Sequence, residues 1–329
     1  MRRSGRVLVT VLVGAALAAV ALTGPASAAP GGVPGPPDQS GTGQPPVAGV
    51  VRPMTNGDLH AARSQASRTR TNNLKYGGGA VQVTTKVYLV FWGSQWTSTD
   101  PVAVYLQSFL SGLGAGETWS RSTTQYCQHT QLGATTCSSG STHIQQPGPA
   151  LAGMWFDSAS AAPAGTSQSQ LAAEARRAAS HFSPSPLGAN VQFVVVTPHG
   201  ASPQGFGTSY CAWHSYTTSA AVGTIAYTNL PYIPDAGAAC GQDFVNTTTG
   251  ALDGVSIVEG HEYAETVTDP FINAWIDQQG AENGDKCAWI NTGPGAATDV
   301  TLSTGSYSVQ SLWSNASNSG AGGCVTSYP

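Results

Sequence analysis

The pattern of apolar and polar positions predicts a domain in which strands and helices alternate. Four runs rich in β-branched and aromatic residues indicate strands, at residues 86–92, 191–197, 222–228 and 307–313. Three segments with helical spacing predict helices, over residues 101–113, 167–182 and 252–269. Asp100 is placed to cap the first of these helices. The pattern therefore predicts an α/β or α+β fold, a mixed sheet covered by helices.

The first residues carry a different pattern. Arg2, Arg3 and Arg6 precede an apolar run over residues 7–23, and the small residues of Ala26-Ser27-Ala28 follow. This arrangement is typical of a secretory signal peptide, here residues 1–28. An uncleaved membrane anchor is the alternative, since the run approaches the length that spans a bilayer. The prediction is a secreted, extracellular protein, cell-wall association being one such location, with no membrane contact once the signal is cleaved.

Residues 29–73 have too little apolar periodicity to predict packed structure. They are rich in Pro, Gly, Ser and Thr, so they could not bury enough apolar surface to offset the entropy of ordering. We expect a disordered linker or pro-segment, an inhibitory propeptide being one form of it. Residues 74–329 then form a single globular domain, a size that one core can support.

Charge narrows the classes of partner. Only 9% of the residues are charged, where about a quarter is usual, and the net charge is −4. No basic stripe follows the N-terminal quarter, which argues against nucleic acid as a partner. An extracellular peptide or a cell-wall component is the substrate class that this composition favours.

Six cysteines in an exported chain favour disulfides over free thiols. We expect the sequential pairing, because each such pair closes a loop that contains turn residues: Cys127–Cys137, Cys211–Cys240 and Cys287–Cys324. The competing idea is a nucleophilic cysteine, since Cys211 lies three residues before His214.

The segment His261-Glu262-Tyr263-Ala264-Glu265 carries the clearest chemistry. Residues four apart on a helix share a face, so His261 and Glu265 can point at one ion with Glu262 beside them. This is a zincin-like HExxE helix, the HExxH zinc helix with its second His replaced by Glu. In such sites a third ligand comes from downstream, and the adjacent Glu, here Glu262, acts as general base on a metal-bound water.

Two carboxylates downstream are candidates for the third ligand. Asp285 lies 24 residues after His261 and Glu282 lies 21 residues after it, in a segment with a glycine turn. Zn²⁺ is the expected ion, and a carboxylate-rich site would also accept Ca²⁺ or Mn²⁺. Nine acids and one base fall between residues 253 and 299, a concentration that favours an ion site. The alternative is an acidic, solvated helix face with an incidental His261.

Three blocks of the chain resemble the phosphate-induced protein 1 or EXORDIUM-like family. The blocks are the Gly-rich segment at 76–79 with the aromatic strand at 86–93, the cysteine-flanked segment at 210–214, and the run from His261 to Cys287. The third block is the most specific, with its HExxE, PxxNAW and ExGDxC strings. The resemblance implies an extracellular or wall-associated protein, and it groups Glu282 and Asp285 with His261 and Glu265.

Other residues give weaker signals. His214 and His199 are candidates for a contact to substrate or transition state. Five of the tryptophans could form a sugar-stacking platform, core packing being the default for most of them: Trp92, Trp96, Trp275, Trp289 and Trp313. The leading hypothesis is a secreted zinc-dependent hydrolase, peptidase-like. A non-catalytic extracellular protein with a structural ion or a glycan-binding role is the alternative.

Overall fold

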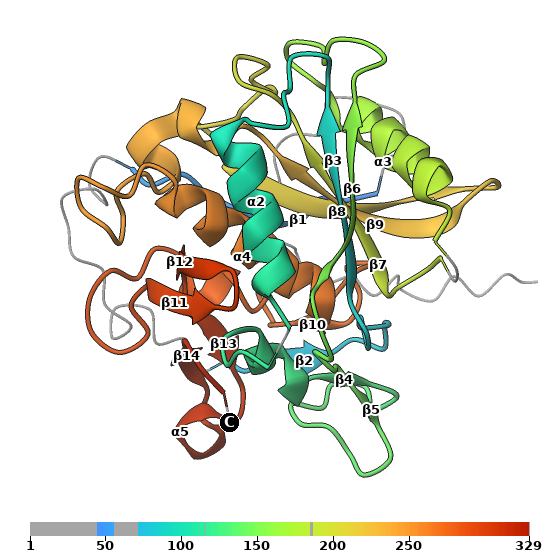
Figure 1. Cartoon of the computed structure of the whole chain (residues 1–329). Coiled ribbons are helices and arrows are strands. Elements are labelled where there is room, and N and C mark those ends of the chain that lie inside the picture. The colour runs from blue at the N-terminus through green and yellow to red at the C-terminus, as the bar shows by residue number, and fades with distance from the viewer. Residues whose placement is uncertain (1–44, 56–71, 115, 185–186, 329) are drawn as a thin grey trace, which may run out of the picture.

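The chain folds around a six-stranded mixed sheet, as a computed structural model of the protein shows (Figure 1). The structure describes residues 45–55, 72–114, 116–184 and 187–328. The sheet has the strand order β1-β8-β9-β7-β3-β6. In chain order its strands are β1 Ala48–Val51, β3 Lys86–Trp92, β6 Leu151–Asp157, β7 Val191–Val196, β8 Ala212–Ser219 and β9 Gly223–Leu230. The fold is therefore mixed α/β, as predicted.

Parallel and antiparallel pairing divide the sheet. The strands β6, β3, β7 and β9 run parallel to one another. The hairpin β8–β9 turns the chain back, so β8 is antiparallel to β9, and β1 is antiparallel to β8. Because β1 lies at one end of the strand order, it covers the edge that β8 would otherwise present.

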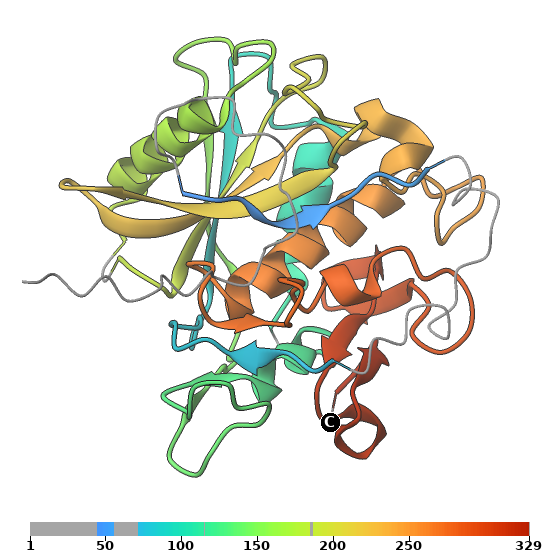
Figure 2. The ribbon, with the colours of Figure 1, turned by 180° about the vertical axis from the view of Figure 1, so that it is seen from behind.

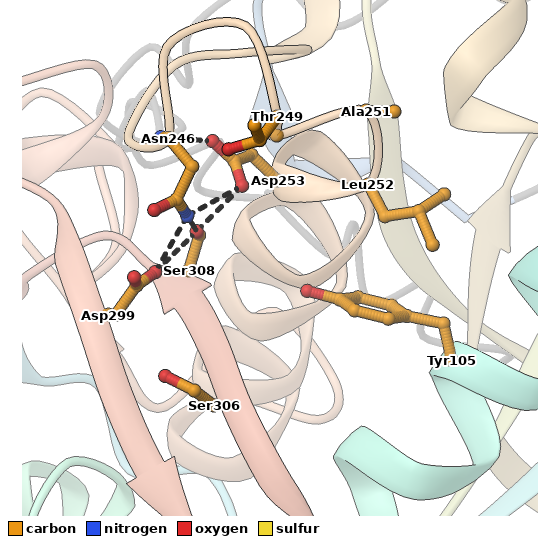
Figure 3. Close-up of a pocket in the computed structure, with 10 residues that line it drawn as sticks. Tyr105, Asn246, Thr249, Ala251, Leu252, Asp253, Asp299, Ser306 and Ser308 are labelled. Carbon is orange, nitrogen blue, oxygen red and sulfur yellow. Dashed lines mark hydrogen bonds between the residues drawn. The ribbon is translucent and has the colours of Figure 1, made fainter.

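Helices cover both faces of the sheet (Figure 1 and Figure 2). The helix α3, Gln168–Phe182, packs on one face against β7, β3, β8 and β9. The helices α2, Pro101–Gly112, and α4, Asp253–Thr268, lie on the other face. The strand β3 shows how the two faces are filled: Val87, Leu89 and Phe91 join the core with α2 and α4, and Val90 joins the core with α3. This alternation follows from the two-residue period of a strand.

Short elements complete the domain outside the main sheet. Four two-stranded sheets form from β4 Cys127–Gln128 with β5 Thr142–His143, β2 Lys75–Tyr76 with β10 Trp275–Ile276, β11 Thr298–Leu302 with β12 Gly305–Val309, and β13 Leu312–Ser314 with β14 Gly323–Val325. The short helical segments are η2 Ser120–Gln125, η3 Ile233–Cys240, η4 Asp285–Cys287 and α5 Ser317–Gly320.

The capping signals in the sequence are realised. The Asp100 side chain accepts a hydrogen bond from the Val102 amide at 2.8 Å, which satisfies a free N–H of the first turn of α2. The helix α3 begins after Ser167, which forms a capping box with Gln170. The predicted strand at 86–92 matches β3, and those at 191–197 and 222–228 match β7 and β9 to within two residues.

The single strand predicted over 307–313 is wrong. The chain forms β12 and β13 there, interrupted at Gln310 and Ser311. Both residues are buried and use their side chains for hydrogen bonds across the domain, Gln310 to the Gly284 carbonyl and Ser311 to the Gly295 carbonyl. These long-range bonds override the local strand pattern.

The expectation of a disordered linker over 29–73 is wrong for residues 48–51, which form β1. Val51 is completely buried and Met54 is 6% exposed, so this short apolar stretch joins the main core. The signal peptide predicted at 1–28 and the rest of the predicted linker, at 29–44 and 56–71, lie outside the described residues. Among the described helices, none has the length and apolar character needed to cross a bilayer.

The cysteine prediction is confirmed. Disulfides join Cys127 to Cys137, Cys211 to Cys240, and Cys287 to Cys324. No cysteine in the described residues is free, which removes Cys211 as a nucleophile. The sugar-stacking platform is not formed by the tryptophans proposed for it, because all five are at most 8% exposed: Trp92, Trp96, Trp275, Trp289 and Trp313.

Candidate metal centre

The helix α4 carries the HExxE segment and is buried along its whole length. It packs against β1, β8 and β9 of the main sheet and against α2, β12 and η3 on its other sides. The expectation of a solvated acidic face is therefore wrong. Glu259, Glu262 and Glu265 are all 0% exposed, so their carboxyl groups must find compensation inside the protein.

One imidazole and two carboxylates converge, as the spacing predicts. The Nε2 of His261 lies 3.0 Å from Oε1 of Glu265, one helical turn later, and 3.7 Å from Oδ1 of Asp285. One potential ligand atom from each residue falls within 4.8 Å of the others. Asp285 belongs to η4 and is the most open of the three, with 22% of its side chain exposed.

A hydrogen bond with Gln310 determines which ring nitrogen of His261 carries the proton. We refer below to His261, Glu265 and Asp285, with the neighbouring His214, Glu262 and Glu282, as the cluster. The Gln310 amide nitrogen donates to the Gly284 carbonyl at 2.8 Å and to the Ser311 carbonyl at 3.2 Å, which leaves its Oε1 as the acceptor end. That oxygen lies 3.1 Å from Nδ1 of His261, so Nδ1 must donate the hydrogen bond. In a neutral imidazole the proton is then on Nδ1, and Nε2 presents a lone pair to Glu265 and Asp285. A metal-binding histidine is commonly oriented in this way.

The loop at residues 282–285 is tied to α4 by hydrogen bonds. The Asp285 amide donates to Oε1 of Glu265 at 2.7 Å, and the Asn283 side chain donates to the Ala264 carbonyl at 3.1 Å. Gly284 permits the close approach, because a Cβ there would lie 2.9 Å from atoms of both His261 and Glu265. The loop therefore holds Asp285 opposite His261 through backbone contacts.

Glu282 points elsewhere than Asp285. Its Oε2 lies 2.8 Å from Nε2 of His214, and that nitrogen lies 3.9 Å from Oε2 of Glu265. His214 comes from β8 and is completely buried. The two oxygens of Glu265 thus face two different imidazoles, Oε1 toward His261 and Oε2 toward His214. Of the two downstream acids, Asp285 is the one beside His261.

Glu262 lies between these groups. A carboxylate oxygen of Glu262, a nitrogen of His214 and an oxygen of Glu265 fall within 4.8 Å of one another. Neither oxygen of Glu262 has a hydrogen bond within the described residues. An unpaired buried carboxyl group is costly, so Glu262 is suited to interact with a water, a substrate or an ion.

Burial and like charge control the protonation of the cluster. Burial raises the pKa of Glu262 well above its usual value, and the nearby Glu265 and Asp285 raise it further. Burial and Glu265 likewise raise the pKa of Glu282, and raise that of Asp285 to about 7. Burial also works to raise the pKa of Glu265, but His261 and His214 outweigh it and lower the value. The cluster therefore needs protons or a cation to compensate its carboxylates.

The two histidines differ. Burial works to lower the pKa of His261, but the Glu265 and Asp285 carboxylates outweigh it and raise the value to about 9. Burial lowers the pKa of His214 to about 4, against the opposing effect of Glu265. His214 is therefore a neutral imidazole at physiological pH, and His261 binds either a proton or a cation at Nε2.

His199 is not part of this cluster. It follows β7, its side chain is 79% exposed, and it pairs with Asp235. A separate group of potential metal ligands consists of Cys127, Cys137 and His143. It offers no thiolate, because the two cysteines are disulfide-bonded. Gln310 could not be identified from the sequence, because no local spacing links it to His261.

Comparison with family models, curated proteins and solved structures finds no match for this chain. The resemblance to the phosphate-induced protein 1 or EXORDIUM-like family thus depends on the sequence strings alone, and the convergence of His261, Glu265 and Asp285 is the structural ground for any functional conclusion.

Proposed function

We propose that this protein is a metal-dependent hydrolase that cleaves peptide bonds, with Zn²⁺ as the ion. His261 Nε2, Glu265 and Asp285 would hold the ion, a donor set of the kind zinc accepts. The observation that supports this most directly is the fixed orientation of His261, whose Nδ1 is tied to Gln310 while Nε2 faces two carboxylates. We keep the EXORDIUM-like relationship as part of this proposal.

The ion would supply a water of lowered pKa and polarise the carbonyl group of the substrate. The charge of the bound ion would favour the ionised form of Glu262, whose pKa burial otherwise raises. Its oxygens have no other hydrogen bond, so the carboxylate would be suited to take a proton from that water. In that reaction the oxygen of the water would bond to the carbonyl carbon, the C–N bond would break, and Glu262 would pass its proton to the departing amine. One neutral imidazole and two carboxylates leave the Zn²⁺ ion near zero net charge, which lowers its acidity and makes the base more important.

Glu262→Gln tests this assignment. We expect the variant to keep its zinc, measured by elemental analysis of the purified protein, and to lose at least 100-fold in turnover of a peptide library, since general-base catalysis contributes about that much or more. Glu259→Gln is the matched control, because Glu259 is on the same helix, is equally buried and also lacks hydrogen-bond partners, but is not among the grouped ligand residues. An active Glu262→Gln variant, or purified protein without zinc, would contradict the proposal.

A non-catalytic protein with a structural ion is the second candidate. The observation in its favour is that His261, Glu265 and Glu262 are all 0% exposed. It predicts that Ca²⁺ or Mn²⁺ raises the melting temperature, that a chelator lowers it, and that no peptide is hydrolysed. In either case the three disulfides support a location outside the cytosol, so we propose that the protein is secreted.

A further inference from the structure

The strand β1 lies over the metal centre. Figure 2 shows it running beside β8 and across the helix α4. Its register with β8 pairs Ala48 with His214 and Val51 with Ala212, so the strand passes directly over a histidine of the cluster. Hydrogen bonds to backbone carbonyls hold the segment at both ends: the Val51 carbonyl accepts from the Cys211 amide, and the Pro46 carbonyl, just before β1, accepts from the Ser215 hydroxyl.

Gly49 of β1 lies against two residues of the cluster, Glu265 and His214. Its φ is +57°, and a Cβ placed on it would overlap Oε2 of Glu265 and the ring of His214. A peptide backbone therefore already lies against the groups that a hydrolase would direct at a peptide bond.

We propose that the edge of β8 beside the metal centre is a binding site for an extended polypeptide with glycine next to the ion, and that β1 occupies this site within the intact chain. This rests on the proposed function and names its substrate class. An added strand is held by main-chain hydrogen bonds, which any extended peptide can make. The space available for its side chains then decides which peptide sequences bind. Here the constraint is the lack of space for a Cβ at the position of Gly49. In the intact chain β1 therefore blocks the peptide site, and displacement of β1 exposes it.

Gly49→Ala in the full chain displaces β1, because the added methyl group would overlap Glu265 and His214. Gly223→Ala is the matched control: its φ is +69°, so the backbone strain is similar, but no atom lies within 4 Å of the new methyl group. We expect hydrogen exchange of the β8 amides from Cys211 to Ser215 to become at least tenfold faster in Gly49→Ala and to stay unchanged in Gly223→Ala.

A synthetic peptide with the sequence of residues 45–55 then tests occupancy. Added to the Gly49→Ala protein, it should restore the protection of the β8 amides, and the same peptide with alanine at the position of Gly49 should not. Hydrolysis of glycine-containing peptides should rise at least tenfold over the wild-type rate. Restored protection without hydrolysis supports the peptide site and contradicts the proposed function.

Other outcomes overturn the inference. They are unchanged exchange in Gly49→Ala, protection restored equally by both peptides, and a wild-type protein that hydrolyses the peptides measurably and as fast as the variant does. Should Gly49→Ala fail to fold, Gln168→Ala provides a milder displacement, since it removes the hydrogen bond from the Gln168 side chain to the Pro45 carbonyl at 2.8 Å. One such bond is worth about 1 kcal/mol, so exchange should accelerate about fivefold. An unchanged exchange rate in that variant would count equally against the site.

Discussion

Replacing Gln310 by methionine tests whether this residue orients His261 for metal binding. Methionine has a similar volume and cannot accept the hydrogen bond from Nδ1, which in the native protein is 3.1 Å long. Loss of such an orienting partner typically weakens metal binding 10- to 100-fold, or about 1.4–2.7 kcal/mol. The substitution also removes a donor from the Ser311 carbonyl and one of the two donors of the Gly284 carbonyl, which still accepts from the Cys287 amide. A buried acceptor left without its donor costs about 1–3 kcal/mol in the stability of the metal-free protein.

The assay is competition for zinc between the protein and a chromogenic chelator, alongside urea unfolding of the metal-free protein. Gln192→Met is the matched control. Gln192 is equally buried and donates to Gln82 at 2.9 Å, on the main sheet away from the His261 cluster. We expect both variants to lose stability and only Gln310→Met to lose zinc affinity. Equal affinity for zinc in wild type and Gln310→Met, or an equal loss in the Gln192→Met control, would refute the role assigned to Gln310.

Two further predictions concern stability and the loop of the centre. Burial and Asp157 raise the pKa of Glu174 to about 8 in spite of Arg177, so the folded state keeps a proton that the unfolded state releases above its ordinary pKa of 4.5. The unfolding free energy of the wild type should therefore fall by a few kcal/mol as the pH rises from about 5 to 8. Urea unfolding at several pH values measures this, and Glu174→Gln should show a smaller decline. Equal pH dependence of the unfolding free energy in wild type and variant would contradict the prediction. Replacing Cys287 and Cys324 by alanine should lower the unfolding free energy by about 2–5 kcal/mol and also weaken zinc binding, because Cys287 ends η4. Removal of the Cys127–Cys137 disulfide should lower the unfolding free energy and leave zinc affinity unchanged. Urea unfolding and chelator competition measure the two quantities.

The sequence predicted the elements whose signals are local. Continuous apolar runs identified β3 and β7, and the capping residue Asp100 located the start of α2. The four-residue spacing of His261 and Glu265 was sufficient to place them on one side of α4. These features depend on residues within one or two helical turns of each other, and so they can be read along the chain.

The features that the sequence missed depend on contacts between distant segments. The strand β1 was taken for part of a linker because its few apolar residues are surrounded by Pro and Gly, and its place in the sheet comes from pairing with β8 about 160 residues later. Gln310 interrupts a predicted strand because it bonds to Gly284 and His261. The choice between Asp285 and Glu282 likewise required the fold of the loop, which aims one acid at each histidine.

The order of the disulfides along the chain has a consequence for biogenesis. Each cysteine is bonded to its nearest unpaired neighbour, with separations of 10, 29 and 37 residues, and no bridge encloses or crosses another. The polypeptide is synthesised from its N-terminus, so the correct partner of the first, third and fifth cysteine is in each case the next cysteine to emerge. Oxidation in order of arrival yields the native pairing, and we expect oxidative folding of the chain as it emerges to require little reshuffling by a disulfide isomerase.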